Sequence, residues 1–188
     1  MRYIRICVTL LGLLALSSCD VEEPTPNTLK RDNEPETKRE KVEKTYLSQV
    51  GIREETGRND GPQVEAYLET TGIGKGNPWC AAFVNWVLKR SEVSTPNSAW
   101  SPDWFKSNVI LERSRGIVGN PRKGDVFGIY FQSMGRVAHV GFVHRWGEDW
   151  VETVEGNSND NGSRDGDGVY RKKRLRSQIY VVSDWVKE

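Results

Sequence analysis

The pattern of apolar and polar positions predicts helices first and strands afterwards. Apolar residues follow helical spacing over 42–50, 62–70, 78–90 and 98–109. Runs typical of strands, separated by Gly and Asn turns, follow at 125–131, 136–144, 150–155, 169–174 and 180–182. Helices that precede a series of adjacent strands are typical of an α+β fold, so we predict N-terminal helices packed on an antiparallel β-sheet.

The N-terminal segment has a different character. Arg2 and Arg5 flank the start of an apolar stretch at 6–16, which has the length of an export signal and is too short to cross a bilayer. The stretch ends in Leu16-Ser17-Ser18-Cys19, which resembles the lipobox of bacterial lipoproteins, where cleavage precedes a lipidated cysteine. We expect a lipid on Cys19 that holds the protein to a membrane. An ordinary signal peptide cut nearby is the alternative.

The next segment is poor in large apolar side chains and contains several prolines. Such a composition cannot bury enough surface to offset the entropy of ordering, so it favours a disordered tether. The remainder has the size of one domain with a single core. We therefore predict a signal peptide at 1–18, a lipidated cysteine and tether at 19–44, and one domain at 45–188.

The charge balance argues against a nucleic-acid partner. Lys and Arg number 27 and Asp and Glu number 26, for a net charge of +1, and binding to a phosphate backbone needs a broad positive surface. The run Arg171-Lys172-Lys173-Arg174 is a local exception next to apolar residues of a predicted strand. A solvated sheet edge is the favoured interpretation, and contact with anionic envelope polymers is the alternative.

We expect the protein to be a monomer.

Cys80 is the candidate nucleophile. Cys7 leaves with the signal peptide and Cys19 is consumed by the lipid, so Cys80 is the remaining thiol and no internal disulfide is expected. Asn77 suits the N-cap of the predicted helix and Pro78 its first position. Cys80 then lies in the first turn, where free N–H groups and the helix dipole favour the thiolate. An inert buried thiol is the alternative.

Two histidines are available to act as a general base. His139 and His144 lie on one predicted strand and face opposite sides of it, so at most one can meet Cys80. Small Ala138 and Gly141 leave room for a helix end beside His139, which we therefore prefer. We interpret His144 as a solvated turn residue.

The next predicted strand offers a group to orient the imidazole. Glu155 and Asn157 share one face of it, and Gly156 permits close backbone approach. A carboxylate and an amide oxygen can both accept the second ring N–H, so the choice between Glu155 and Asn157 stays open. Two polar residues at a strand end, without a catalytic role, are the alternative.

These segments together resemble the CHAP family of cysteine, histidine-dependent amidohydrolases and peptidases, over about residues 51–183. The matching elements are Trp79-Cys80-Ala81-Ala82-Phe83-Val84, Gly124-Asp125-Val126, His139-Val140-Gly141 and Glu155-Gly156-Asn157. The resemblance implies a papain-like α+β core, Cys80 as nucleophile and His139 as base, with Glu155 and Asn157 completing the site. It also implies a peptidoglycan substrate, cut through a thioester acyl-enzyme at the sugar-to-peptide amide or within the stem and cross-bridge.

No metal or other cofactor is expected. Some family members have an acidic calcium loop before the cysteine, but here that region offers only Asn59-Asp60-Gly61. The segment 159–167 is rich in Asn, Asp and Gly but lacks the closing Glu of a calcium loop, so it favours a flexible turn. One cysteine and two opposed histidines make a zinc site a poor interpretation.

Aromatic residues near the cysteine are candidates for substrate binding. Trp79, Trp100 and Trp104 could stack on sugars in a groove, with ordinary core packing as the alternative. We predict a secreted cysteine amidase or endopeptidase, anchored at the periplasmic or outer face of a bacterial membrane. A non-catalytic envelope-binding lipoprotein, or a secreted effector or transferase, is the alternative.

Overall fold

The helices precede the strands, as the sequence pattern predicts. The computed structural model describes residues 35–160 and 166–187, and the predicted signal peptide, Cys19 and most of the predicted tether lie outside these ranges. Within them the α-helices are α1 (Lys38–Leu47), α2 (Pro62–Glu69) and α3 (Cys80–Arg90). None of these helices combines the length and apolar character needed to cross a membrane.

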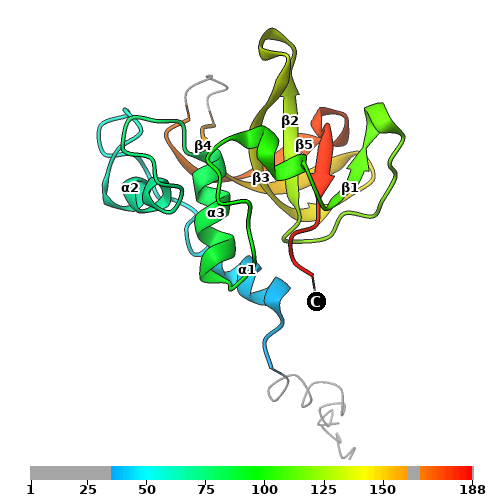
Figure 1. The fold of residues 1–188 in the computed structure, drawn as a ribbon, viewed down its shortest axis with the longest axis horizontal. Coiled ribbons are helices and arrows are strands. Elements are labelled where there is room, and N and C mark those ends of the chain that lie inside the picture. Colours follow the sequence, from blue (N-terminus) through cyan, green and yellow to red (C-terminus); the bar gives the residue numbers. More distant parts are fainter. Residues whose placement is uncertain (1–34, 161–165, 188) are drawn as a thin grey trace, which may run out of the picture. The chain divides into compact units, whose positions relative to one another are not determined.

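The described strands form one antiparallel sheet. They are β1 (Val109–Glu112), β2 (Val126–Phe131), β3 (Arg136–Trp146), β4 (Trp150–Ser158), β5 (Gly168–Leu175) and β6 (Val181–Ser183), in the spatial order β1-β6-β2-β3-β4-β5. Strands β2 to β5 form a meander, and β6 returns to pair with β2 and β1. Helices and sheet form separate parts (Figure 1), so the α+β class with an antiparallel sheet is confirmed.

Helix α3 forms most of the contact between the helices and the sheet. It packs on β3 and β4, while α1 and α2 pack against α3 itself. Phe83 of α3 is fully buried, and its ring meets Phe142 of β3 and Tyr67 of α2 edge-on. Because these large rings fill the space between the layers, the start of α3 is held at one position relative to the strands.

Gly156 lets β4 approach the start of α3 closely. A Cβ atom at this position would lie 2.7 Å from Phe83 Cβ and 2.8 Å from the ring of Trp79, far inside normal contact. The close backbone approach predicted for Gly156 is therefore confirmed. The adjacent residues Glu155 and Asn157 are brought to the N-terminal end of α3 by this contact.

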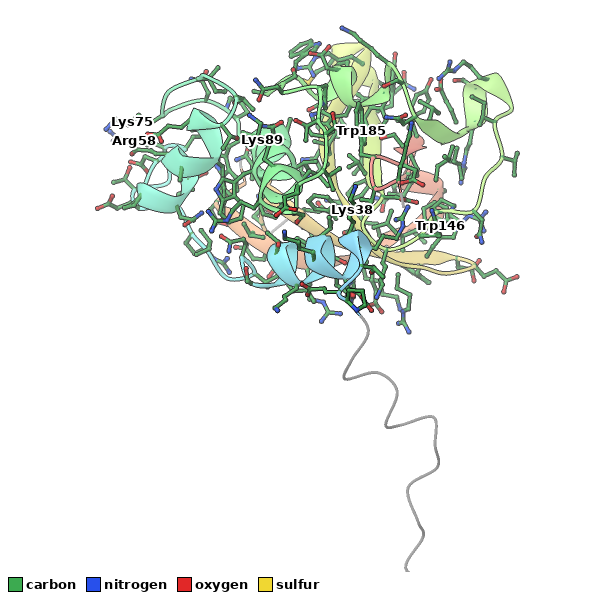
Figure 2. The ribbon with its side chains drawn as sticks, turned by 60° about the horizontal axis from the view of Figure 1, so that its bottom comes forward. Lys38, Arg58, Lys75, Lys89, Trp146 and Trp185 are labelled. Atoms are coloured by element: carbon green, nitrogen blue, oxygen red, sulfur yellow. The ribbon has the colours of Figure 1, made fainter. Side chains whose placement is uncertain are left out.

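Helix α1 starts earlier than predicted. The tether was expected to continue to residue 44, but the helix begins at Lys38, which Figure 2 labels beside this helix. Thr37 and Glu40 form a capping box, in which Thr37 Oγ1 accepts from the Glu40 N–H at 3.2 Å and the Glu40 carboxylate accepts from the Thr37 N–H at 2.9 Å. Arg39 is buried and forms ion pairs with Asp125 and Asp184, at 2.8 and 2.7 Å. These contacts order a segment whose composition favours disorder.

The segment 98–109 is not the predicted helix. A 3₁₀ turn covers Ser101–Phe105, and β1 begins at Val109. Asn108 adopts a left-handed φ of 57°, which ends the turn before the strand. Pairing of β1 with β6 then decides its conformation, and that partner is distant in the sequence.

The contact at Gly156 generates a stability prediction. Gly156→Ala should lower the free energy of unfolding by about 1–3 kcal/mol, because the added methyl group must displace Phe83 or Trp79. Urea unfolding measures this change. Gly74→Ala is the matched control, since no atom lies within 4 Å of its added Cβ, and it should change stability by less than about 0.5 kcal/mol. Equal effects of the two substitutions would contradict the packing role.

Candidate active site

Cys80 is the first residue of α3 and is buried, with 6% of its surface exposed. The predicted cap is wrong in detail: the N-cap is Trp79, with φ −124° and ψ 12°, and the Asn77 side chain instead donates to the Gly74 carbonyl at 2.9 Å. Pro78 was the predicted first residue of the helix, but the helix begins two residues later, at Cys80. Cys80 still lies in the first turn, near the positive end of the helix dipole.

Asn157 holds the segment that enters α3. Its Oδ1 accepts the backbone N–H of Trp79 at 3.1 Å, and its Nδ2 donates to Asn59 Oδ1 at 3.2 Å and to the Gly166 carbonyl at 3.1 Å. Its φ of 52° lies in the left-handed region, which asparagine tolerates better than most residues. The side chain of Asn157 thus fixes the loop before the cysteine, and these hydrogen bonds do not involve the imidazole of His139.

His139 connects the thiol to Glu155. Its Nε2 lies 2.8 Å from Glu155 Oε2, and its side chain interacts with Cys80 closely enough for each to shift the pKa of the other. Since Nε2 is engaged by the carboxylate, Nδ1 is the ring nitrogen left to face the thiol. A bulge precedes it in β3, where Ile129 pairs with His139 but Tyr130 pairs with Val137. Such bulges bend a strand and redirect its side chains.

The thiol and the imidazole shift each other's pKa. Burial by itself raises the pKa of Cys80, but the hydrogen bond and charge of His139, with the Ser101 hydroxyl 3.7 Å from Sγ and the Val140 backbone, bring it below its ordinary value. Burial lowers the pKa of His139, but Cys80 and Glu155 outweigh this and raise it to about 9. Both shifts favour the thiolate–imidazolium form of the pair.

Glu155 is a fully buried carboxylate surrounded by donors. Besides His139, Thr153 Oγ1 donates to Oε1 at 2.5 Å and Ser158 Oγ to Oε2 at 3.3 Å, while Arg174 Nε donates to Oε1 at 2.6 Å and its Nη2 to Oε2. Burial raises the pKa of Glu155, but the hydrogen bonds and charges of Arg174 and His139 hold it well below its usual range. The carboxylate therefore stays charged beside the imidazole.

Arg174 is a site residue that sequence reasoning missed. We had placed it in a solvated basic run, but its side chain is only 20% exposed and pairs with Glu155. Along β5 the exposed residues Arg171 and Lys173 alternate with the half-buried Lys172 and Arg174. The alternation of faces along a strand was the signal that could have placed Arg174 on the inner face of β5. Ser101 was also missed, and nothing in its sequence context marks it.

His144 belongs to a different contact. It lies in β3 rather than in the predicted solvated turn, with Nδ1 3.0 Å from the Tyr46 hydroxyl and 3.6 Å from Glu43 Oε1. Burial and, secondarily, Arg171 lower its pKa. The two histidines thus contact separate parts of the structure, His139 at the cysteine and His144 at α1.

The tryptophans differ in exposure. Trp79 and Trp104 have no exposed surface, because Trp79 stacks on Tyr67 and Trp104 meets Trp185 edge-on. These two cannot stack on a sugar, so for them the core alternative holds. Trp100 is 50% exposed next to Ser101, and the Arg136 guanidinium lies 3.9 Å from the centre of its ring.

A cavity of about 850 Å³ opens on the imidazole side of the site. His139 is part of its wall, together with the end of β2, residues 157–159 at and just after the end of β4, and Lys172 and Arg174 of β5. Among the described residues, no three His, Cys, Asp or Glu side chains gather as they would around a metal ion. The predicted turn at 159–167 lies partly outside the described residues.

Part of the chain is similar to known proteins. The profile of the CHAP domain matches residues 72–157, a segment that includes Cys80, His139, Glu155 and Asn157. A solved structure of a mutated form of the Resuscitation Promoting Factor Interacting protein RipA is similar with a TM-score of 0.50 and 16% sequence identity. The similarity covers 80% of this chain and 63% of that one, less than two thirds of its length. At this identity the likeness is one of fold.

No curated protein matches the sequence of this chain. Over residues 72–157 this chain matches the CHAP domain family.

Proposed function

We propose that this protein hydrolyses amide bonds of peptidoglycan through a thioester acyl-enzyme on Cys80. The observation that supports this most directly is the series of Cys80, His139 and Glu155, in which the imidazole lowers the pKa of the buried thiol and lies 2.8 Å from the buried carboxylate. A thiol with a lowered pKa, a base that can donate its proton, and a group that orients this base are the requirements of acyl transfer by a cysteine.

The first half of the reaction forms the acyl-enzyme. The Cys80 thiolate attacks the amide carbonyl, and the backbone N–H of Cys80, at the start of α3, is a candidate donor to the developing oxyanion. The His139 imidazolium then gives its proton to the leaving amine as the C–N bond breaks. Glu155 stabilises the imidazolium before this step and holds the ring so that Nδ1 faces the sulfur.

The second half releases the acid. The neutral imidazole of His139 now accepts a proton from water, and the hydroxide attacks the thioester carbonyl. The C–S bond breaks, the acid leaves, and the thiolate–imidazolium pair is restored. In this scheme Asn157 acts by positioning the Cys80 loop through the Trp79 N–H, and Glu155 acts on the imidazole itself.

Removing either reacting side chain should abolish hydrolysis. We expect Cys80→Ala and His139→Ala to release no new amines from purified sacculi above the buffer control, because attack and proton transfer each lose their group. His144→Ala is the matched control, since that ring contacts Tyr46 and Glu43, and it should keep a rate near wild type. Near-UV circular dichroism checks the fold of all three variants. Wild-type-like release by Cys80→Ala would refute the proposal.

The pKa shifts predict a bell-shaped dependence of kcat/KM on pH. Activity should rise as the thiol ionises, below the pH at which a free thiol would, and fall as the imidazolium loses its proton near pH 9. Iodoacetamide labelling of Cys80 should follow the rising limb. Glu155→Gln removes a charge that raises the pKa of His139, so the falling limb should move down by roughly 1–3 pH units.

The pH dependence of kcat/KM in Asn157→Ala is the comparison for that of Glu155→Gln. It should lower the rate through the Trp79 loop while leaving the falling limb near pH 9. A falling limb that moves equally in both variants would show that the two residues do not have the separate roles proposed here.

We also propose that the enzyme is exported and anchored to a bacterial membrane by a lipid on Cys19. The support is the N-terminal sequence, with its basic start, apolar stretch and Leu16-Ser17-Ser18-Cys19. Globomycin treatment of expressing cells should shift the protein to the larger unprocessed form on a gel, and Cys19→Ser should remove this response. Processing of the wild type that globomycin leaves unchanged would exclude lipoprotein maturation.

A further inference from the structure

The described wall of the cavity beside His139 carries positively charged side chains and no negatively charged ones. Among the described residues, its wall includes Arg113, Lys172 and Arg174 but no Asp or Glu. The chain as a whole is balanced, with 27 basic and 26 acidic residues, so composition alone does not account for this wall. Other basic side chains lie elsewhere, such as Arg58 and Lys75, which project outward beside α2 (Figure 2).

Two of the three cations carry charge that no described residue of the wall neutralises. Arg174 is matched by Glu155, to which it donates from Nε and Nη2. Lys172 instead donates to the carbonyl oxygen of Asn159, and Arg113 to the carbonyl oxygen of Arg176 at 3.0 Å. Carbonyl oxygens position a cation but leave its charge available. Lys172 is half-buried on the same face of β5 as Arg174, and both Lys172 and Asn159, whose carbonyl it binds, line the cavity.

The position of the cavity beside His139 indicates which side of the scissile bond it can bind. In the proposed reaction His139 gives its proton to the leaving amine, so the amine-side part of the substrate must pass over the imidazole. His139 forms part of the cavity wall, whereas Cys80 and Ser101, which contact each other at 3.7 Å, are not among the residues that line it. The cavity is therefore suited to the amine-side segment and not to the acyl group.

We propose that this cavity selects a substrate whose amine-side segment carries a free carboxylate, held by Lys172 and Arg113. The inference rests on the proposed function and names the chemical class of its leaving group: an amino acid or peptide with an unamidated carboxylate near the newly released amine. Charge-assisted hydrogen bonds to a carboxylate in a partly desolvated wall are the interactions that distinguish it from a neutral carboxamide. Neutral donors and acceptors beside it, such as Gln132 and Gln178, suit the peptide groups of that segment.

The test compares two forms of one substrate. Free amines of purified sacculi are first acetylated, and one half of the preparation is then treated with carbodiimide and excess ammonia to convert free carboxylates to carboxamides. New amines released by the full-length protein give the rate on each form. Wild type should hydrolyse the untreated sacculi about tenfold faster.

Variants assign this preference to the cavity. Lys172→Gln and Arg113→Gln should each bring the ratio of the two rates toward one by slowing hydrolysis of untreated sacculi, with little change on amidated sacculi. Lys173→Gln is the matched control, because this lysine is exposed on the opposite face of β5, near the ring of Trp150, and it should keep the wild-type ratio. Lys172→Arg retains the charge and should also keep the preference. Arg113 is exposed, so its variant tests the proposal even if Lys172→Gln fails to fold.

The outcomes separate this inference from the proposed function. Equal rates of wild type on both forms, or a tenfold preference that survives in Lys172→Gln and Arg113→Gln, would overturn the inference and leave hydrolysis standing. An absence of release from both forms would overturn the proposed function and this inference with it.

Discussion

The negative charge of Glu155, which is fully buried, is the constraint on which the site depends. Removing a carboxylate from water costs several kcal/mol unless it is paired and hydrogen-bonded. Here the compensation comes from the strands on either side of β4: His139 of β3 and Arg174 of β5 both bind the carboxylate. The order β3-β4-β5 in the sheet is therefore also the arrangement that keeps the carboxylate charged.

This arrangement divides one carboxylate between two cations. Burial raises the pKa of Glu155, but the hydrogen bond of Arg174 and then that of His139 hold it low, so the carboxylate stays charged beside the imidazole. Because Arg174 also binds this carboxylate, less of the negative charge of Glu155 is available to stabilise the imidazolium of His139. The pKa of His139 is nevertheless raised to about 9, which favours the protonated ring beside the thiolate. Arg174 is thus a positioning residue, acting on His139 through Glu155.

Three successive residues of β4 have three separate tasks at the start of α3. Glu155 binds the imidazole, Gly156 permits contact with Phe83 and Trp79, and Asn157 binds the Trp79 N–H. A register shift makes this division possible: Glu155 pairs with Tyr170 but Ser158 pairs with Gly168, so β4 holds an extra residue between these pairs. With the left-handed φ of Asn157, the bulge turns the amide away from the face that strict alternation assigns to it.

The sequence by itself determined that helices precede the sheet, that Cys80 lies in the first turn of a helix, and which residues of two later strands are candidates for the site. These features follow from local periodicity and from the chemistry of single residues, which can be recognised without knowing which distant residues they contact. Only the tertiary structure decided between Glu155 and Asn157 as the contact of the imidazole, because a bulge interrupts the period of two. It alone assigned Arg174 to the site and buried Trp79 and Trp104, since pairing between strands and packing between layers join residues that are far apart in the chain.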